Sequence, residues 1–218
     1  MRIPRVHMKR TGLTRRASDH GRAYPLNEKN MPKSDGTPES VAKILDYLDV
    51  EKSARYKRTH RSTFCNIYAH DFAALMGAFV PRVWWTDSVL KSGNFGLVKY
   101  NHTVRELNAN SLAKWFKEYG ERFGWRKLNS ANEIVAEANT GKCVILVAAN
   151  KTKSRSGHIV AAVPETENHE AVGARGVYIY PLQSQAGGTN RKYFANNWWK
   201  SGHDPLGAYV FEGTPEFI

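Results

Sequence analysis

The stretch CVILVAANKTKSRSGHIVAAVPE, residues 143–165, decides the fold. It contains two continuous apolar runs, residues 143–149 and 158–165, each of a length that is typical of a buried strand. The linker between them is polar and ends in Gly157, which favours an antiparallel hairpin. A third run, VYIYPLQSQAGG at residues 177–188, predicts a strand that ends in a glycine pair. The second half of the chain therefore predicts an antiparallel sheet.

Helical patterns precede these strands. Thr37 is expected to cap a first helix, with Pro and Glu in its first turn. Ser62 or Thr63 is expected to cap a second helix, FCNIYAHDFAALMGAF, which carries a wide apolar face. A third helix is predicted from Asn110, and a capping box at Ser130 opens a fourth. Helices followed by an antiparallel sheet predict the α+β class.

The 218 residues suit one domain of ordinary size with an appendage. Residues 1–36 contain nine Lys and Arg against three Asp and Glu, and prolines and glycines interrupt them. We therefore predict a flexible basic tail over residues 1–36 and a single domain over residues 37–218. Residues 80–140 are expected to form a helical insert in that domain, within which residues 81–109 are compatible with loop, short helix or both.

Composition limits the classes of function. The chain has 32 Lys and Arg against 20 Asp and Glu, and a formal charge of +12 favours a polyanionic partner such as nucleic acid, anionic lipid or an acidic cell-wall polymer. The N-terminus has no apolar run of signal-peptide length, and no stretch approaches the roughly 20 apolar residues that cross a bilayer. Two cysteines do not make a disulfide scaffold, although one bridge between them remains open. No HExxH or Cys-x-x-Cys spacing indicates a zinc site, so we expect neither metal nor cofactor.

Cys65 stands where a reactive thiol is expected, in the first turn of the second predicted helix. Unpaired N–H groups and the positive end of the helix dipole stabilise a thiolate there and lower its pKa. The basic segment KSARYKRTHR, residues 52–61, acts in the same direction. A free cysteine is more often a small hydrophobic core residue, and that interpretation fits Cys143 in its apolar strand. Cys65 is therefore the candidate nucleophile.

A nucleophilic thiolate needs a base within hydrogen-bond reach, and that base is usually a histidine. Of the eight histidines, His158 follows a glycine and opens an apolar strand, so we expect its ring at the edge of the sheet. A third polar group orients the imidazole in such sites. Gln183 and Gln185 end the next predicted strand and are candidates for this role, with an ordinary polar strand end as the alternative for both.

Together these features resemble the NlpC-type cysteine peptidases of bacterial cell walls. The resemblance covers residues 62–78 and 140–188, about a third of the chain, and its motifs are Cys65-Asn66, Ala69-His70-Asp71, Gly157-His158 and Ser-Gln-Ala-Gly at a strand end. It implies a papain-like core, with N-terminal helices packed on a small antiparallel sheet. It also implies Cys65 as nucleophile, His158 as base and Gln185 as third member. A glutamine departs from the more usual His or Asp, and it would orient the ring by a neutral hydrogen bond.

The resemblance implies that the protein cleaves amide bonds in peptidoglycan stem peptides. The backbone N–H of Cys65 is the expected oxyanion donor. Asn66 is a candidate second donor or a helix-surface residue, and Asp71 is a candidate structural support. The pairs Trp84-Trp85 and Trp198-Trp199 line a cleft or belong to the core.

A cell-wall hydrolase without a signal peptide reaches its substrate by another route, such as a phage holin or an injection machine. The chain is similar to antibacterial amidase effectors of the type VI secretion system. That similarity implies action in the periplasm or cell wall of a target bacterium, with a cognate immunity protein and a secretion-apparatus component as partners. The alternatives are a phage-type lysin, an acyltransferase of the same fold, and a basic nucleic-acid-binding protein. We do not favour the last, because no helix-turn-helix, zinc-finger or RNA-recognition signature is present.

Overall fold

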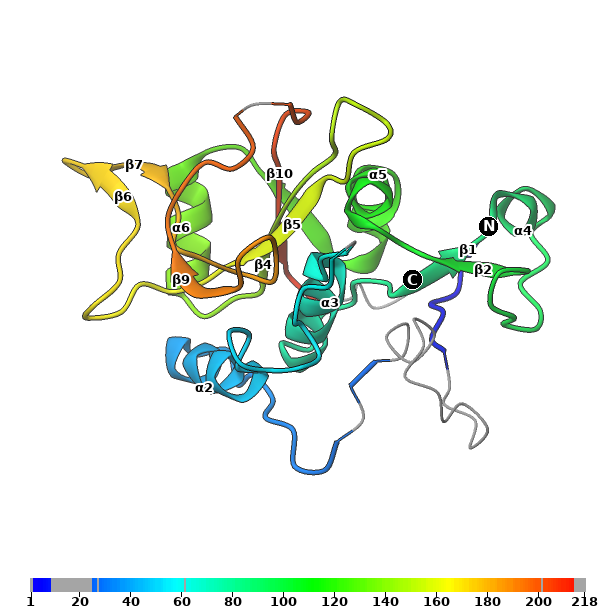
Figure 1. Ribbon diagram of the computed structural model, residues 1–218, viewed down its shortest axis with the longest axis horizontal. Helices are drawn as coiled ribbons and strands as arrows, with labels where there is room; N and C mark the ends of the chain where they lie inside the picture. The colour runs from blue at the N-terminus through cyan, green and yellow to red at the C-terminus, as the bar shows by residue number, and fades with distance from the viewer. Residues whose placement is uncertain (1, 9–24, 27, 61, 201, 214–218) are drawn as a thin grey trace.

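A six-stranded antiparallel sheet forms the centre of the molecule (Figure 1). The computed structural model describes residues 2–8, 25–26, 28–60, 62–200 and 202–213. In spatial order the strands of the sheet are β3 (Trp125–Leu128), β10 (Gly207–Phe211), β4 (Val144–Ala148), β5 (His158–Ala162), β8 (Gln183–Gln185) and β9 (Arg191–Phe194). The predicted α+β class is confirmed.

The hairpin that the sequence predicts is present. β4 and β5 pair antiparallel from Val144 opposite Ala162 to Ala148 opposite His158, so His158 lies at the loop end of the hairpin. The predicted strand 177–188 is divided into two. Its first part, β7 (Val177–Tyr180), pairs with β6 (Val172–Ala174) in a separate ribbon, while β8 joins β5. Pro181, which has no N–H to donate to a ladder, follows β7 directly.

Helices cover both faces of the central sheet. α3 (Cys65–Leu75) and α5 (Ala109–Tyr119) pack on one face, and α6 (Ala131–Asn139) packs on the other. Along β4, Ile145 and Val147 join the core under α3 and α5, whereas Val144 and Leu146 join the core under α6. This alternation follows from the two-residue period of a strand. α2 (Pro38–Leu48) packs against α3 from outside.

Two of the predicted helix caps are present and one is wrong. Thr37 accepts a hydrogen bond from the Ser40 N–H, and Ser130 accepts one from the Glu133 N–H. α3, in contrast, starts at Cys65 after Phe64, which has no side-chain capping bond. Cys65 is thus the first residue of its helix, and neither Ser62 nor Thr63 caps it.

The stretch 80–140 is helical only in part. It contains the ribbon of β1 (Val83–Trp85) and β2 (Val104–Glu106), together with α4 (Asp87–Ser92), the 3-10 turn η1 (Gly120–Phe123), α5 and α6. It also supplies the edge strand β3 of the central sheet, so this stretch completes the fold and is not a helical insertion into it. Trp84 packs against Trp115 and Phe123 in the core and, with Trp85, also lines a small hollow of about 80 Å³.

The prediction of a flexible tail over residues 1–36 is wrong for residues 2–8. Val6 is 2% exposed, the Trp85 indole N–H donates to the Pro4 carbonyl at 3.0 Å, and the Arg5 guanidinium lies over the Phe79 ring. Apolar burial and the aromatic ring thus hold this basic segment on the domain. Residues 9–24 of the predicted tail lie outside the described residues. Within the described part of the chain, no helix is long and apolar enough to cross a membrane.

Candidate functional site

The Cys65 thiol lies at the start of β5. Its helix packs on β5, and the backbone N–H of Ile159 is close enough to the sulfur to lower the pKa of the thiol. Ile159 directly follows His158, so the fold brings Cys65 to the strand residue that adjoins the predicted base. Sequence separation between the two segments is large, and only the packing of α3 against the sheet joins them.

The predicted low pKa of Cys65 is wrong for this arrangement. Cys65 is only 4% exposed, and burial raises the pKa of its thiol to about 11. The N–H groups of Ile159, Asn66 and Cys65 itself act in the opposite direction, but their effect is smaller than that of burial. The thiol is therefore protonated at neutral pH, and a nucleophilic role requires a base that takes its proton during attack.

His158 and Gln185 form a direct hydrogen bond. The distance between His158 Nε2 and Gln185 Oε1 is 2.7 Å, and the Gln185 amide nitrogen donates to the Thr189 carbonyl at 2.9 Å. Because the amide nitrogen is used by Thr189, the Gln185 oxygen faces the ring and Nε2 must carry the proton. In the neutral His158 ring, Nδ1 therefore carries a lone pair and can accept a proton.

Burial lowers the pKa of His158, and the charge of His203 lowers it further, while the hydrogen bond that His158 donates to Gln185 acts in the opposite direction. A histidine in this condition is neutral at pH 7 and is available as a base. Cys143, the other cysteine, lies buried just before β4. Burial raises the pKa of its thiol, and among the described residues no N–H group or histidine acts on it in the opposite direction.

Trp198 and a buried glutamine shield the His158 ring. The Trp198 ring stands edge-on to it with centroids 4.8 Å apart. Gln183 accepts a 2.9 Å hydrogen bond from the Trp198 indole N–H and donates to the Pro181 and Asn196 carbonyls. Both polar atoms of the Gln183 amide are thus engaged, the oxygen with Trp198 and the nitrogen with backbone carbonyls, and it is Gln185 that forms the hydrogen bond with the imidazole.

Gly187 is a site residue that the sequence reasoning missed. A Cβ at this position would lie 3.2 Å from His158 Cε1 and 3.5 Å from Gln185 Cδ. The distance to the ring is tighter than an ordinary contact, whereas the distance to Gln185 is an ordinary one, so a side chain at this position would press on the His158 ring. The glycine pair after Gln185 indicates a turn that lets the backbone approach closely, but it does not by itself indicate that the His158 ring is the group approached.

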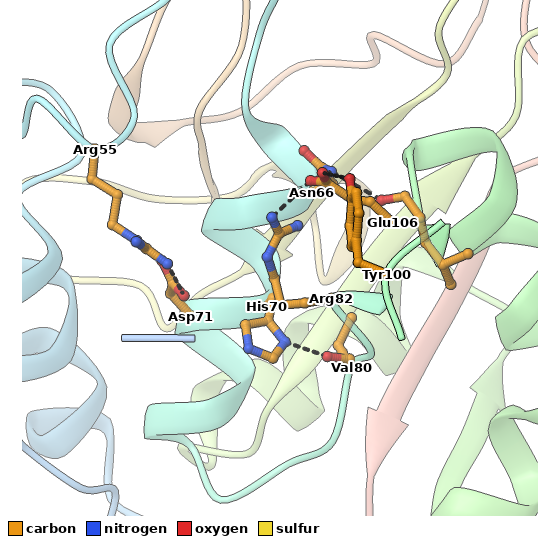
Figure 2. A network of polar contacts seen from close by, with 9 residues as sticks. Arg55, Asn66, His70, Asp71, Val80, Arg82, Tyr100 and Glu106 are labelled. Carbon is orange, nitrogen blue, oxygen red and sulfur yellow. Dashed lines mark hydrogen bonds and ion pairs between the residues drawn. The ribbon is translucent and has the colours of Figure 1, made fainter. Parts of the chain in front are cut away.

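Asn66 and Asp71 are both engaged in structural contacts (Figure 2). The Asn66 amide nitrogen donates to the Leu107 carbonyl at 2.9 Å and to Glu106 at 3.4 Å. Glu106 in turn accepts from the Arg82 guanidinium at 2.7 Å. The Asn66 side chain therefore anchors the first turn of α3 to the segment after β2, and its donors are already committed.

Asp71 is a structural support, as predicted, and it holds the segment before α3. Its carboxylate is fully buried and accepts two hydrogen bonds from Arg55 and one from Tyr56. The Arg55 guanidinium is therefore paired with Asp71, and it is not among the groups that lower the pKa of the Cys65 thiol. Neighbouring His70 donates from Nδ1 to the Val80 carbonyl, and burial lowers its pKa well below the usual value.

The Gln185 bond predicts a measurable change in the titration of His158. Replacing Gln185 by Ala removes an acceptor that favours the protonated ring, so we expect the pKa of His158 to fall further. Replacing it by Glu places a carboxylate against Nε2 and should raise that pKa above the wild-type value. Histidine NMR titration measures both shifts, with His169, which stacks on Tyr193, as the internal control. Equal His158 titration in all three proteins would contradict the bond.

The structure is that of an α+β protein in which a strand-opening histidine is hydrogen-bonded to a glutamine, and a helix-opening cysteine lies near Ile159, the residue that follows this histidine. Comparison of the chain with protein-family models finds no match, and neither does comparison with curated proteins. Among the described residues, no group of three or more His, Cys, Asp or Glu side chains is arranged to hold a metal ion.

Proposed function

We propose that this protein is a cysteine hydrolase that cleaves amide bonds in peptidoglycan stem peptides. The single observation that supports the enzymatic part is the hydrogen bond of 2.7 Å between His158 Nε2 and Gln185, with the Cys65 thiol near Ile159, the next residue of the same strand. The choice of peptidoglycan rests on the resemblance to the NlpC-type peptidases, and the formal charge of +12 agrees with an anionic polymer.

In the proposed reaction, His158 Nδ1 takes the Cys65 proton while the sulfur attacks the amide carbonyl. The backbone N–H of Cys65, at the N-terminus of α3, stabilises the oxyanion that forms. The imidazolium then protonates the leaving amine as the C–N bond breaks, which leaves a thioester on Cys65. Water attacks the thioester, gives its proton to His158 and releases the carboxylic acid, which restores the free thiol.

The biological setting is part of the same proposal. The enzyme acts as an antibacterial effector that is delivered to the envelope of a target bacterium, where an immunity protein protects kin cells. Expression of the chain with an added periplasmic signal in a test bacterium should cause lysis, whereas expression without that signal should not.

Incubation of purified sacculi with the protein tests the reaction directly. Mass spectrometry of the soluble muropeptides should show new products for wild type and none for Cys65→Ala. Cys143→Ala is the matched control, since it removes the other buried thiol and should leave the products unchanged. Digestion by Cys65→Ala at the wild-type rate would refute the proposal, and the masses of the products identify the bond that is cut.

A further inference from the structure

Two adjoining hollows form a groove along α5. The first, of about 920 Å³, lies between the C-terminal half of α5 and strands β3 and β10. The second, of about 550 Å³, follows α5 towards its N-terminus. Both are lined by Lys117, Glu118, Lys127 and Tyr209, so they form one groove. α5 has 11 residues, which corresponds to a length of about 16 Å.

The groove ends at the loop that carries His158. Its last lining residues are Asn110, Ala148 and Ala149. Asn110 accepts a hydrogen bond from the Asn150 N–H and donates to the Arg155 carbonyl, both at 2.9 Å, and so holds the loop between β4 and β5. Ala148 lies opposite His158 in the β4–β5 ladder. A chain lying in the groove would thus be led to the start of β5, where the Cys65 sulfur also lies.

Cations without carboxylate partners occupy the middle of the groove. Lys117 and Lys127 are exposed, and in the described part of the chain neither has a carboxylate within ion-pair distance. Glu118, which lines the same place, is already paired with Lys114 at 3.6 Å. The other acidic side chains of the groove lie towards its ends, Glu121 and Glu212 in the first hollow and Asp204 in the second.

The loop at the end of the groove adds further positive charge. Lys151, Lys153 and Arg155 are exposed there, and the loop contains no acidic residue. A ligand with carboxylates spaced along a chain would therefore meet lysines at the middle of the groove and again beside the site. A neutral chain would gain nothing from this pattern.

We propose that this groove binds a length of the anionic polymer whose amide bond is cleaved, namely peptidoglycan with its carboxylate-bearing stem peptides. This inference rests on the proposed function and adds to it a polymer-binding subsite outside the reacting residues. Lys117 and Lys127 are its central contacts, and they act on binding, not on the chemical step.

Sedimentation with sacculi tests the groove without hydrolysis. In a Cys65→Ala background, the double variant Lys117→Ala/Lys127→Ala should bind sacculi about five- to tenfold more weakly than its parent, as expected for the loss of two exposed charge contacts. The difference should shrink as salt is raised. Lys43→Ala/Lys91→Ala is the matched control, because it removes two exposed lysines from α2 and α4 and should bind like the parent.

Activity measurements separate this inference from the proposed function. In the active enzyme, the groove double variant should digest sacculi more slowly but cleave a short soluble stem peptide at the wild-type rate. If the groove variant weakens binding but the wild-type protein cleaves nothing, the groove inference stands and the proposed hydrolase function is refuted. Cleavage with no effect of the groove variant on sacculi would overturn the groove alone. The inference would also be overturned if the control variant Lys43→Ala/Lys91→Ala lost as much binding to sacculi as the groove variant. The same holds if the groove variant lost as much binding to duplex DNA as to sacculi.

Discussion

Replacing His158 by Ala is expected to lower amide cleavage at pH 7 by about 10³- to 10⁴-fold. The reason is the raised pKa of Cys65, about 11, which leaves roughly one thiol in 10⁴ ionised at pH 7 when no base assists. A base that takes the proton during attack removes this penalty, and in the proposed mechanism that base is the neutral His158 imidazole, whose strand neighbour Ile159 lies near the thiol. The measurement is kcat/KM on a soluble stem peptide between pH 6.5 and 9.5.

The pH profile separates this role from a structural one. Cleavage by the His158→Ala variant should rise about tenfold per pH unit over the measured range, because the thiolate fraction rises in that proportion below the pKa of the thiol. Cys65→Ala should stay inactive at every pH. His169→Ala is the control for loss of a histidine away from the site. A flat profile for His158→Ala, or a loss below tenfold at pH 7, would remove His158 from the role of base.

The elements nearest the site were predictable because their signals are local. Two apolar runs joined by a polar linker are sufficient to predict the β4–β5 hairpin, and Gly157 marks where the second strand starts. The same pattern places His158 at a strand end and Gln185 on the neighbouring strand. The class of fold follows from the order of these elements along the chain.

Properties that depend on tertiary packing were not predictable in the same way. The helix start alone predicts a low pKa for Cys65, but the sheet that buries the thiol reverses the direction. The sequence reasoning missed β10, which lies between β3 and β4, because its pairing partners are remote in the chain. Likewise, the charge of residues 2–8 suggests a free tail, whereas the burial of Val6 depends on a surface formed by other segments.

The second large effect concerns stability. Replacing Asp71 by Ala is expected to lower the free energy of unfolding by about 3–5 kcal/mol, because it leaves a partly buried Arg55 without its counter-charge. The wild-type carboxylate is fully buried and contacts Arg55 at 2.5 and 3.0 Å and the Tyr56 hydroxyl at 2.9 Å. Urea titration followed by tryptophan fluorescence measures the loss.

Asp87→Ala provides the comparison, because the ion pair between Asp87 and Arg105 is exposed on both sides and should contribute less than about 1 kcal/mol. The two readouts also decide what Asp71 does for the enzyme. If it only fastens the segment before α3, the folded fraction of Asp71→Ala at low temperature should cleave the stem peptide within a fewfold of the wild-type rate. A stability loss no larger than that of Asp87→Ala would contradict the structural role of the buried pair. A large loss of cleavage in fully folded protein would show that the contacts of Asp71 act through the site itself.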